Sequence, residues 1–162
     1  MSKVMDDSPA SNALVTKLAI SVMSVYEKLD WLSPLSILFI RLWVGWVFFR
    51  SGLTKINSWD STMYLFENEY SVPLLPPELA AYLGTAAELC LPVLLVFGLA
   101  GRFGAIALFA FNIVAVLSYP DLNAAGIRDH QVWGIMLLVP LLQGPGKLSL
   151  DYFLCKKFCP KG

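Results

Sequence analysis

The chain has 162 residues, of which 57% are hydrophobic and 15% are charged, with a mean hydropathy of +0.63 and a formal net charge of zero. Soluble domains average about 45–50% apolar and about 25% charged residues. A disordered chain would be poor in apolar residues, and a nucleic-acid-binding protein would carry a basic surplus, so the composition excludes both classes. An integral membrane protein remains, with the lipid bilayer as its surroundings.

The N-terminal segment, residues 1–32, is expected to lie in the cytoplasm and at the membrane interface. It begins with polar and acidic residues instead of the basic start of a cleavable signal peptide. The apolar stretch 14–26 is too short to span a bilayer and is interrupted by Lys17 and by hydroxyl side chains. It predicts a helix that lies in the interface.

Four longer apolar stretches predict a four-helix membrane domain over residues 33–146. Ser33 and Pro34 suit the N-cap and first turn of the first span. The fourth span contains Pro140 and is close to the lower limit of about 17 residues. The expected spans are about 35–57, 77–100, 103–119 and 127–143.

Shorter helices are expected beside the spans. Residues 59–70 mix aromatic and acidic side chains and predict a helix on the outer interface, and the proline-rich residues 72–77 predict an extended entry into the second span. Residues 144–146, Gly-Pro-Gly, end the fourth span. The tail, 147–162, has an apolar stripe that predicts a cytoplasmic interfacial helix. The predicted fold class is all-α: a four-transmembrane-helix bundle with amphipathic interfacial helices at the N-terminus, in the first outer loop and at the C-terminus.

The positions of the basic residues predict the topology. In the four-span arrangement three basic residues lie within the first span, and Arg128 is the single one on one side of the membrane. The other side holds Lys3, Lys17, Lys28, Arg102, Lys147, Lys156, Lys157 and Lys161. By the positive-inside rule both termini lie in the cytoplasm. We therefore expect a multi-pass protein of the bacterial cytoplasmic (inner) membrane.

Polar side chains inside the spans mark the candidate site, because each ionisable group costs about 2.5–3.5 kcal/mol on insertion scales. A rise of about 1.5 Å per residue places Arg50 roughly 10 Å and Glu88 roughly 16 Å below the outer surface, so these two side chains are expected to pair. Lys55 is shallower and could approach from above. The candidate polar pocket consists of Arg50, Lys55, Glu88, Asn112, His130 and Gln131. It either opens outward and binds a quinone head group, an anion or a sulfur species, or its groups only hold the bundle together.

Other residues of the first span have different expected roles. Gly45 and Gly52 lie on one helical stripe and are expected to let a neighbouring helix approach closely. Arg41 is expected to snorkel to the inner surface. No metal site is expected, because His130 is the single histidine. No catalytic or cofactor motif is present, so the catalytic residues and the question of whether the chain is an enzyme stay open.

Three segments carry a resemblance to a known family: RLWVGWVFFRSGLTKI, AAELCLPVLLVFGLAGRFGA and GPGKLSLD. Over residues 35–151 the chain resembles the DoxX family of small four-helix membrane proteins. The resemblance implies a helical bundle with both termini inside. The matching polar positions are Arg41, Lys55 and Glu88, and the matching packing positions are Gly45 and Gly52.

The resemblance also implies a role. The family takes its name from a subunit of a thiosulfate:quinone oxidoreductase, and other members resemble membrane partners of redox or detoxification proteins. The expected function is a membrane subunit or anchor of a redox-linked complex (quinone- or sulfur-related, or concerned with detoxification), with a protein partner and with quinone as the cofactor to test. The alternatives are a quinone-reactive oxidoreductase in its own right and a small transporter or export component, for example for modified metal-binding peptides. A homo-oligomer is left open.

Overall fold

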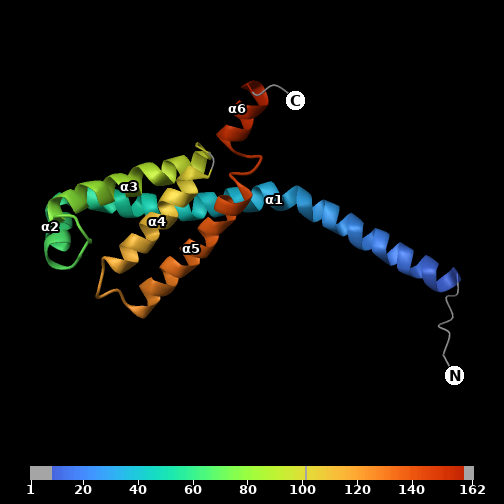
Figure 1. Cartoon of the computed structure of the whole chain (residues 1–162), viewed down its shortest axis with the longest axis horizontal. Coiled ribbons are helices and arrows are strands. Elements are labelled where there is room, and N and C mark those ends of the chain that lie inside the picture. Colours follow the sequence, from blue (N-terminus) through green and yellow to red (C-terminus); the bar gives the residue numbers. More distant parts are fainter. Residues whose placement is uncertain (1–8, 101, 159–162) are drawn as a thin grey trace. The chain divides into compact units, whose positions relative to one another are not determined.

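A computed structural model describes residues 9–100 and 102–158, with side chains described from residue 16 onward. These residues form six helices and no strand, which confirms the predicted all-α class. The helices are α1 (Pro9–Asn57), α2 (Trp59–Asn68), α3 (Pro77–Phe97), α4 (Phe103–Leu117), α5 (Ala124–Gln143) and α6 (Leu150–Phe158) (Figure 1).

Helix α1 is continuous over 49 residues and contains Pro34 in its interior. The prediction that Ser33 and Pro34 begin a helix was therefore wrong, as was the prediction of a separate short helix at 14–26. An interior proline removes one backbone hydrogen bond, and the good helix formers on both sides continue the helix through it. The chain divides at this place into two compact units, Met1–Ser33 and Pro34–Gly162. The site described below lies entirely in the second unit.

Helix α3 begins as the sequence predicts and ends earlier. Pro76 is extended, with φ −64° and ψ 150°, and Pro77 opens the helix. The helix ends at Phe97 because Gly98 adopts the left-handed conformation, with φ +62°, and its N–H caps the last turn. A left-handed cap ends a helix at low cost only where the residue is glycine.

Helix α5 begins three residues before the predicted start of the fourth span. The side chain of Asn123 accepts a hydrogen bond of 2.8 Å from the N–H of Gly126, which is an N-cap, so the helix starts at Ala124. It ends at Gln143, before Gly144, as the Gly-Pro-Gly segment predicts. Helices α2 and α6 confirm the predicted helices in the first loop and in the tail.

The core of the second unit lies where α1, α3, α4 and α5 meet. It is formed by Val44, Phe48, Leu95, Ala105, Leu108 and Leu137. Helices α1 and α3 run side by side (Figure 1) and touch closely at two glycines. A Cβ atom on Gly45 would overlap Val96, and one on Gly52 would lie 2.9 Å from Leu89 Cδ2. Small residues at these positions therefore allow the two backbones to approach.

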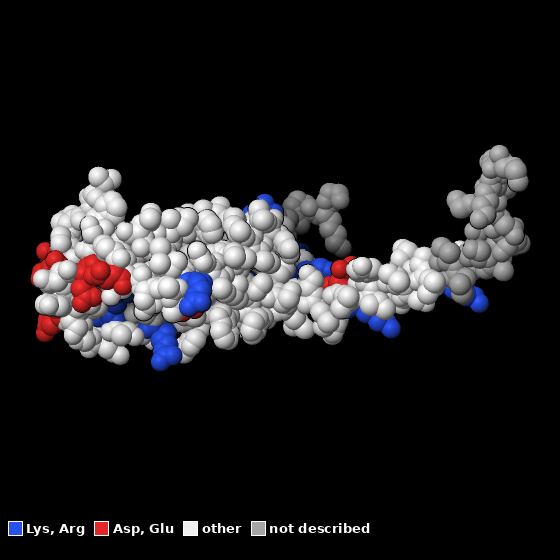
Figure 2. Space-filling view, turned by 90° about the horizontal axis from the view of Figure 1, so that it is seen from below, with Lys and Arg blue, Asp and Glu red and all other residues white. Residues whose placement is uncertain are grey.

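The outer surface of the second unit is apolar although polar groups are buried inside it. Large side chains such as Trp46, Ile106 and Ile135 are 60%, 52% and 67% exposed, whereas Arg41 and Glu88 are 1% and 7% exposed. The flank in Figure 2 is largely uncharged, and acidic side chains gather at the end where α2 lies. Exposed apolar surface on this scale, with charges inside, is typical of a protein that contacts lipid.

Among the residues that the structure describes, two helical segments are long and apolar enough to cross a membrane: Thr16–Asn57 of α1, and α3. Helix α4 is apolar but has only 15 residues. Helix α5 is not among the candidates, because the polar residues 128–131 lie near its start.

Candidate functional site

A cavity of about 420 Å³ lies inside the second unit, between α1, α3, α4 and α5 and beneath the segments that follow α2 and α4. Much of its wall is aromatic: Phe48, Phe66, Tyr70, Phe111, Tyr119 and Trp133. Its polar lining residues are Ser51, Lys55, Glu88, Ser118 and His130. An apolar wall with a few convergent polar groups, and a volume in the range of about 300–1,000 Å³, is typical of small-molecule sites.

The charged part of the wall is an ion pair between α1 and α3. Lys55 Nζ lies 2.6 and 2.7 Å from the two carboxylate oxygens of Glu88 and 3.2 Å from Ser51 Oγ. The side chains of Lys55 and Glu88 are 13% and 9% exposed. Glu88 is next to Gly52, where α1 and α3 are in close contact. The pair is therefore fixed in position by the packing of the two helices.

The predicted Arg50–Glu88 pair does not form, and Lys55 takes the place of Arg50. Five residues along a helix correspond to a rotation of about 140°, so Arg50 and Lys55 point in clearly different directions. Arg50 is exposed and does not line the cavity. The depths of Arg50 and Glu88 along their spans were compatible with an ion pair. The direction of each side chain around the axis of α1, however, decides which one reaches α3.

Asn112 and His130 form a second polar contact, between α4 and α5. Asn112 Nδ2 donates to the backbone oxygen of His130 at 3.0 Å, and Asn112 Oδ1 lies 2.7 Å from His130 Nδ1. Because the amide oxygen can only accept, Nδ1 carries the proton, and Nε2 of a neutral ring is an acceptor. His130 also packs edge-on against Phe48 and Trp133, and all three line the cavity.

The remaining member of the predicted pocket lies elsewhere. Gln131 is exposed and lines a second, more open hollow, together with Asn112 and His130. Of the six predicted pocket residues, the cavity brings together Lys55, Glu88 and His130. In the described part of the chain no three His, Cys, Asp or Glu side chains are close enough to hold a metal ion.

The segment after α2 closes one side of the cavity and is tied to the end of α4. The N–H of Ser71 donates to the oxygen of Ser118 at 2.7 Å, and the Tyr119 hydroxyl donates to Glu69 Oε2 at 3.3 Å. The rings of Tyr70 and Tyr119 meet edge to face with centroids 5.0 Å apart. The Glu69 carboxylate raises the pKa of Tyr119, and burial raises the pKa of Tyr70, so both phenols stay protonated at neutral pH.

Arg41 occupies the other end of the second unit, and the prediction that it snorkels to the surface is corrected. Its guanidinium donates to the backbone oxygens of Leu95 at 2.8 Å, Pro145 at 2.7 Å and Leu148 at 2.9 Å, and also to that of Val96. The side chain is fully buried among carbonyls of the last turn of α3 and of the segment after α5. It joins the end of α3 to the segment after α5.

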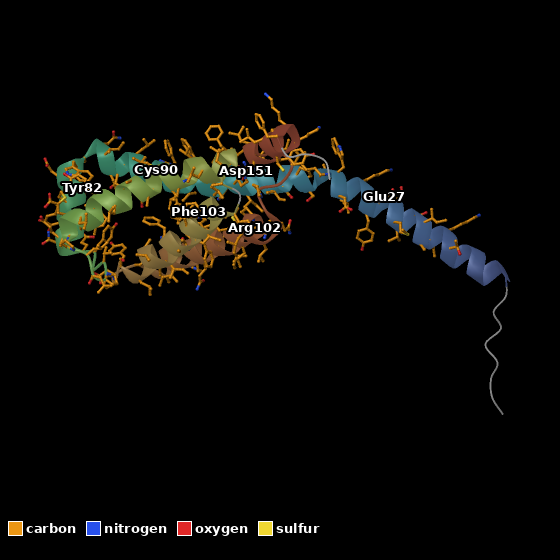
Figure 3. All side chains as sticks on the ribbon, turned by 45° about the horizontal axis from the view of Figure 1, so that its top comes forward. Glu27, Tyr82, Cys90, Arg102, Phe103 and Asp151 are labelled. Carbon is orange, nitrogen blue, oxygen red and sulfur yellow. The ribbon has the colours of Figure 1, made fainter. Side chains whose placement is uncertain are left out.

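The start of α6 belongs to the same end of the unit. Asp151, labelled in Figure 3, accepts a hydrogen bond of 3.2 Å from the N–H of Ala100, and its own N–H donates to the oxygen of Gly98. Arg102, also labelled there, lies just before α4. The α3–α4 turn and the first turn of α6 are thus bonded to each other.

The sequence did not predict the part that α2 and the segments after α2 and α4 play in the cavity wall. Phe66, Tyr70, Ser118 and Tyr119 all line it, and none was a candidate. Phe66 packs on Ala80 and Ala81 of α3, which holds α2 over the cavity. The aromatic residues of 59–70 were a visible feature, but they were interpreted as anchors in the membrane interface.

Comparisons with known proteins agree with the earlier resemblance. The model of the DoxX family matches residues 36–120. An uncharacterized protein of Haemophilus influenzae is 31% identical over 138 residues, which cover 80% of this chain and 89% of that protein. A protein of Bacillus subtilis named "Putative oxidoreductase CatD" is 32% identical over 122 residues, which cover 74% of this chain and 87% of that protein. No solved structure matches this chain.

Proposed function

Because the chain belongs to the DoxX family, we propose that it is a multi-pass protein of the bacterial inner membrane and the membrane subunit, or anchor, of a redox-linked complex. The aromatic cavity with its buried Lys55–Glu88 pair carries this proposal. Its ligand is the head group of a quinone. The complex is quinone-related and has a protein partner that supplies the electrons.

The proposed membrane domain, residues 33–146, uses α1, α3, α4 and α5 as its four spans. At about 1.5 Å per residue, the 20 residues of α5 reach about 30 Å and the 15 residues of α4 reach about 22 Å. Because α4 is shorter than the hydrocarbon core of the bilayer, either the bilayer thins locally at this helix or the turns that flank α4 cover the remaining thickness. The exposed apolar side chains on all four helices support this arrangement, because they would otherwise face water.

The proposed topology places the cavity near the outer surface. Its wall includes residues of α2 and of the segments after α2 and after α4. These parts of the chain carry Asp60, Glu67, Glu69 and Asp121, and residues 58–76 and 118–123 contain no Lys or Arg. The opposite end has Arg102, Lys147, Lys156 and Lys157. By the positive-inside rule this bias supports a cytoplasmic position for the second end, with α6 in the tail 147–162 on the inner surface.

The residues of the cavity fit a quinone head group. Aromatic side chains can stack on its ring, and the Lys55 ammonium can donate to a ring oxygen. Glu88 and His130 Nε2 can accept a hydrogen bond from the hydroxyl of the reduced form. A quinone bound here would supply a two-electron acceptor, while these side chains orient it and exclude water.

A second candidate function is a quinone-reactive oxidoreductase that acts without a partner. The printed name of the Bacillus subtilis relative favours this alternative. Purification from native membranes separates the two: a subunit or anchor is expected to retain a redox protein in stoichiometric amount, and quinone reduction by the isolated chain with a soluble electron donor would favour the alternative.

Ligand binding by the purified chain tests the proposal directly. We expect menadione to raise the Tm of the detergent-solubilised protein in a concentration-dependent way, because it binds the folded state only. Lys55→Met should reduce this shift strongly. Arg50→Met is the matched control, since Arg50 is an exposed base on the same helix that does not line the cavity, and it should leave the shift intact. No shift in the wild-type protein would contradict the proposal.

Labelling of Cys155 tests the topology. This residue lies on α6 and is exposed. In a variant with Cys159→Ser, a membrane-impermeant maleimide should label Cys155 in inverted vesicles and leave it unlabelled in spheroplasts. The reverse pattern would place the tail on the outer side and refute the proposed orientation.

A further inference from the structure

One buried hydroxyl in the cavity wall has no hydrogen-bond partner. Ser118 is 5% exposed, and its Oγ makes no hydrogen bond within the described residues. The backbone of Ser118 is satisfied: its N–H donates to Val114 at 2.9 Å, and its oxygen accepts from Ser71 at 2.7 Å. Burial of a hydroxyl without a partner is unfavourable, and most buried polar atoms in proteins avoid it.

Several other polar side chains of the wall already have protein partners. Lys55 and Glu88 bond each other, His130 Nδ1 bonds Asn112, and the Tyr119 hydroxyl bonds Glu69. Ser118 comes from the C-terminal cap of α4, whereas the ion pair comes from α1 and α3. Ser118 and the ion pair are therefore hydrogen-bonding groups of the cavity on different helices, and aromatic side chains form much of the remaining wall.

We propose that Ser118 Oγ binds the second oxygen of the ring whose first oxygen lies at the Lys55–Glu88 pair. The site then selects aromatic rings with two oxygens over rings with one. This inference rests on the proposed function of the cavity. A serine hydroxyl can rotate, so it donates to the carbonyl of a quinone and accepts from the hydroxyl of a hydroquinone. Ser118 is thus the residue that accommodates both redox states.

Two ligands and one pair of variants test the inference in the full-length, detergent-solubilised protein. Menadione carries two ring oxygens, and 1-naphthol carries one on a ring system of the same size. We expect Ser118→Ala to weaken menadione binding about fivefold, as for the loss of one neutral hydrogen bond, and to leave 1-naphthol binding unchanged. Ser71→Ala is the matched control: this exposed serine contacts Ser118 through its backbone, so both affinities should stay the same.

The stability of the ligand-free variants distinguishes a binding role from a structural one. Because Ser118 Oγ is unbonded, the Tm of Ser118→Ala without ligand should equal or exceed that of the wild type. Unchanged menadione affinity in Ser118→Ala would overturn the inference and leave the proposed function standing. An equal loss for both ligands would also overturn it, since the serine would then only shape the wall. Failure of the wild-type protein to bind either ligand would refute the proposed function and this inference with it.

Discussion

Arg41 and Lys55 are two basic residues on the same stripe of α1, about 21 Å apart along the helix axis. Both side chains are largely buried, but their hydrogen-bond partners differ. Arg41 donates to four backbone oxygens, two in the last turn of α3 and two in the segment after α5, which only the folded chain brings together. Lys55 bonds side chains and lies in the wall of a cavity.

This difference separates a structural charge from one that can act on a ligand. The five donors of a guanidinium suit several fixed carbonyls, and a site that uses them on the backbone has little capacity left for a ligand. An ammonium paired with one carboxylate can turn toward a third group. The Arg41 end of the unit therefore holds α3 and the segment after α5 together, and the Lys55 end is the proposed binding site.

Replacement of Arg41 should have the largest effect. Arg41→Met removes a hydrogen-bond donor from four backbone oxygens, and we expect a loss of about 3 kcal/mol or more in the free energy of unfolding. Denaturation in mild detergent measures it. Arg50→Met, which alters an exposed arginine nine residues away, should cost less than about 0.5 kcal/mol. Similar losses in both variants would show that Arg41 has no special role.

Replacement of Gly98 tests the same contacts around Arg41 by changing the backbone conformation at the end of α3. A Cβ here would lie 2.5 Å from Ser149 Cβ and 2.8 Å from Arg41 Nη2, on a residue with φ +62°. Gly98→Ala should therefore destabilise the protein by about 1–3 kcal/mol. Gly134→Ala serves as the control, because its Cβ would make an ordinary contact of 3.4 Å with Asn112. A stable Gly98→Ala variant would argue against the left-handed cap.

A double-mutant cycle tests the ion pair at the other end. Lys55→Met and Glu88→Gln should each destabilise the protein by about 1–3 kcal/mol, and the double variant should lose less than the sum, because neither charge is then left unpaired. The same cycle with Arg50→Met and Glu88→Gln should be additive within about 0.5 kcal/mol. A coupling energy between Glu88 and Arg50, and none between Glu88 and Lys55, would contradict the observed ion pair and support the Arg50–Glu88 pair that was predicted from depth.

The sequence predicted the elements of this fold better than their contacts. Composition, prolines and glycines predicted α2, α3, α6 and the end of α5, because these are local properties. The partner of Glu88 depends on helix rotation, which the stripe containing Gly52 and Lys55 indicated and depth did not. The burial of Arg41 depends on carbonyls 54 to 107 residues away, and no local pattern reports their convergence.

The hydrogen bond between Tyr119 and Glu69 gives the smallest expected effect and a pH dependence. Glu69 raises the pKa of Tyr119 in the folded protein above its unfolded value of about 10. The stabilisation is therefore fully present below about pH 10 and is lost as the pH rises through the folded pKa. Tyr119→Phe should lower Tm slightly at pH 8, and this difference from the wild type should shrink as the pH rises above about 10. Glu69→Gln should remove most of the pH dependence, since the Glu69 carboxylate is its main cause. If the Tm difference between Tyr119→Phe and the wild type stays the same at high pH, the ring contact between Tyr119 and Tyr70, and not the Tyr119 hydroxyl, connects the loop to α4.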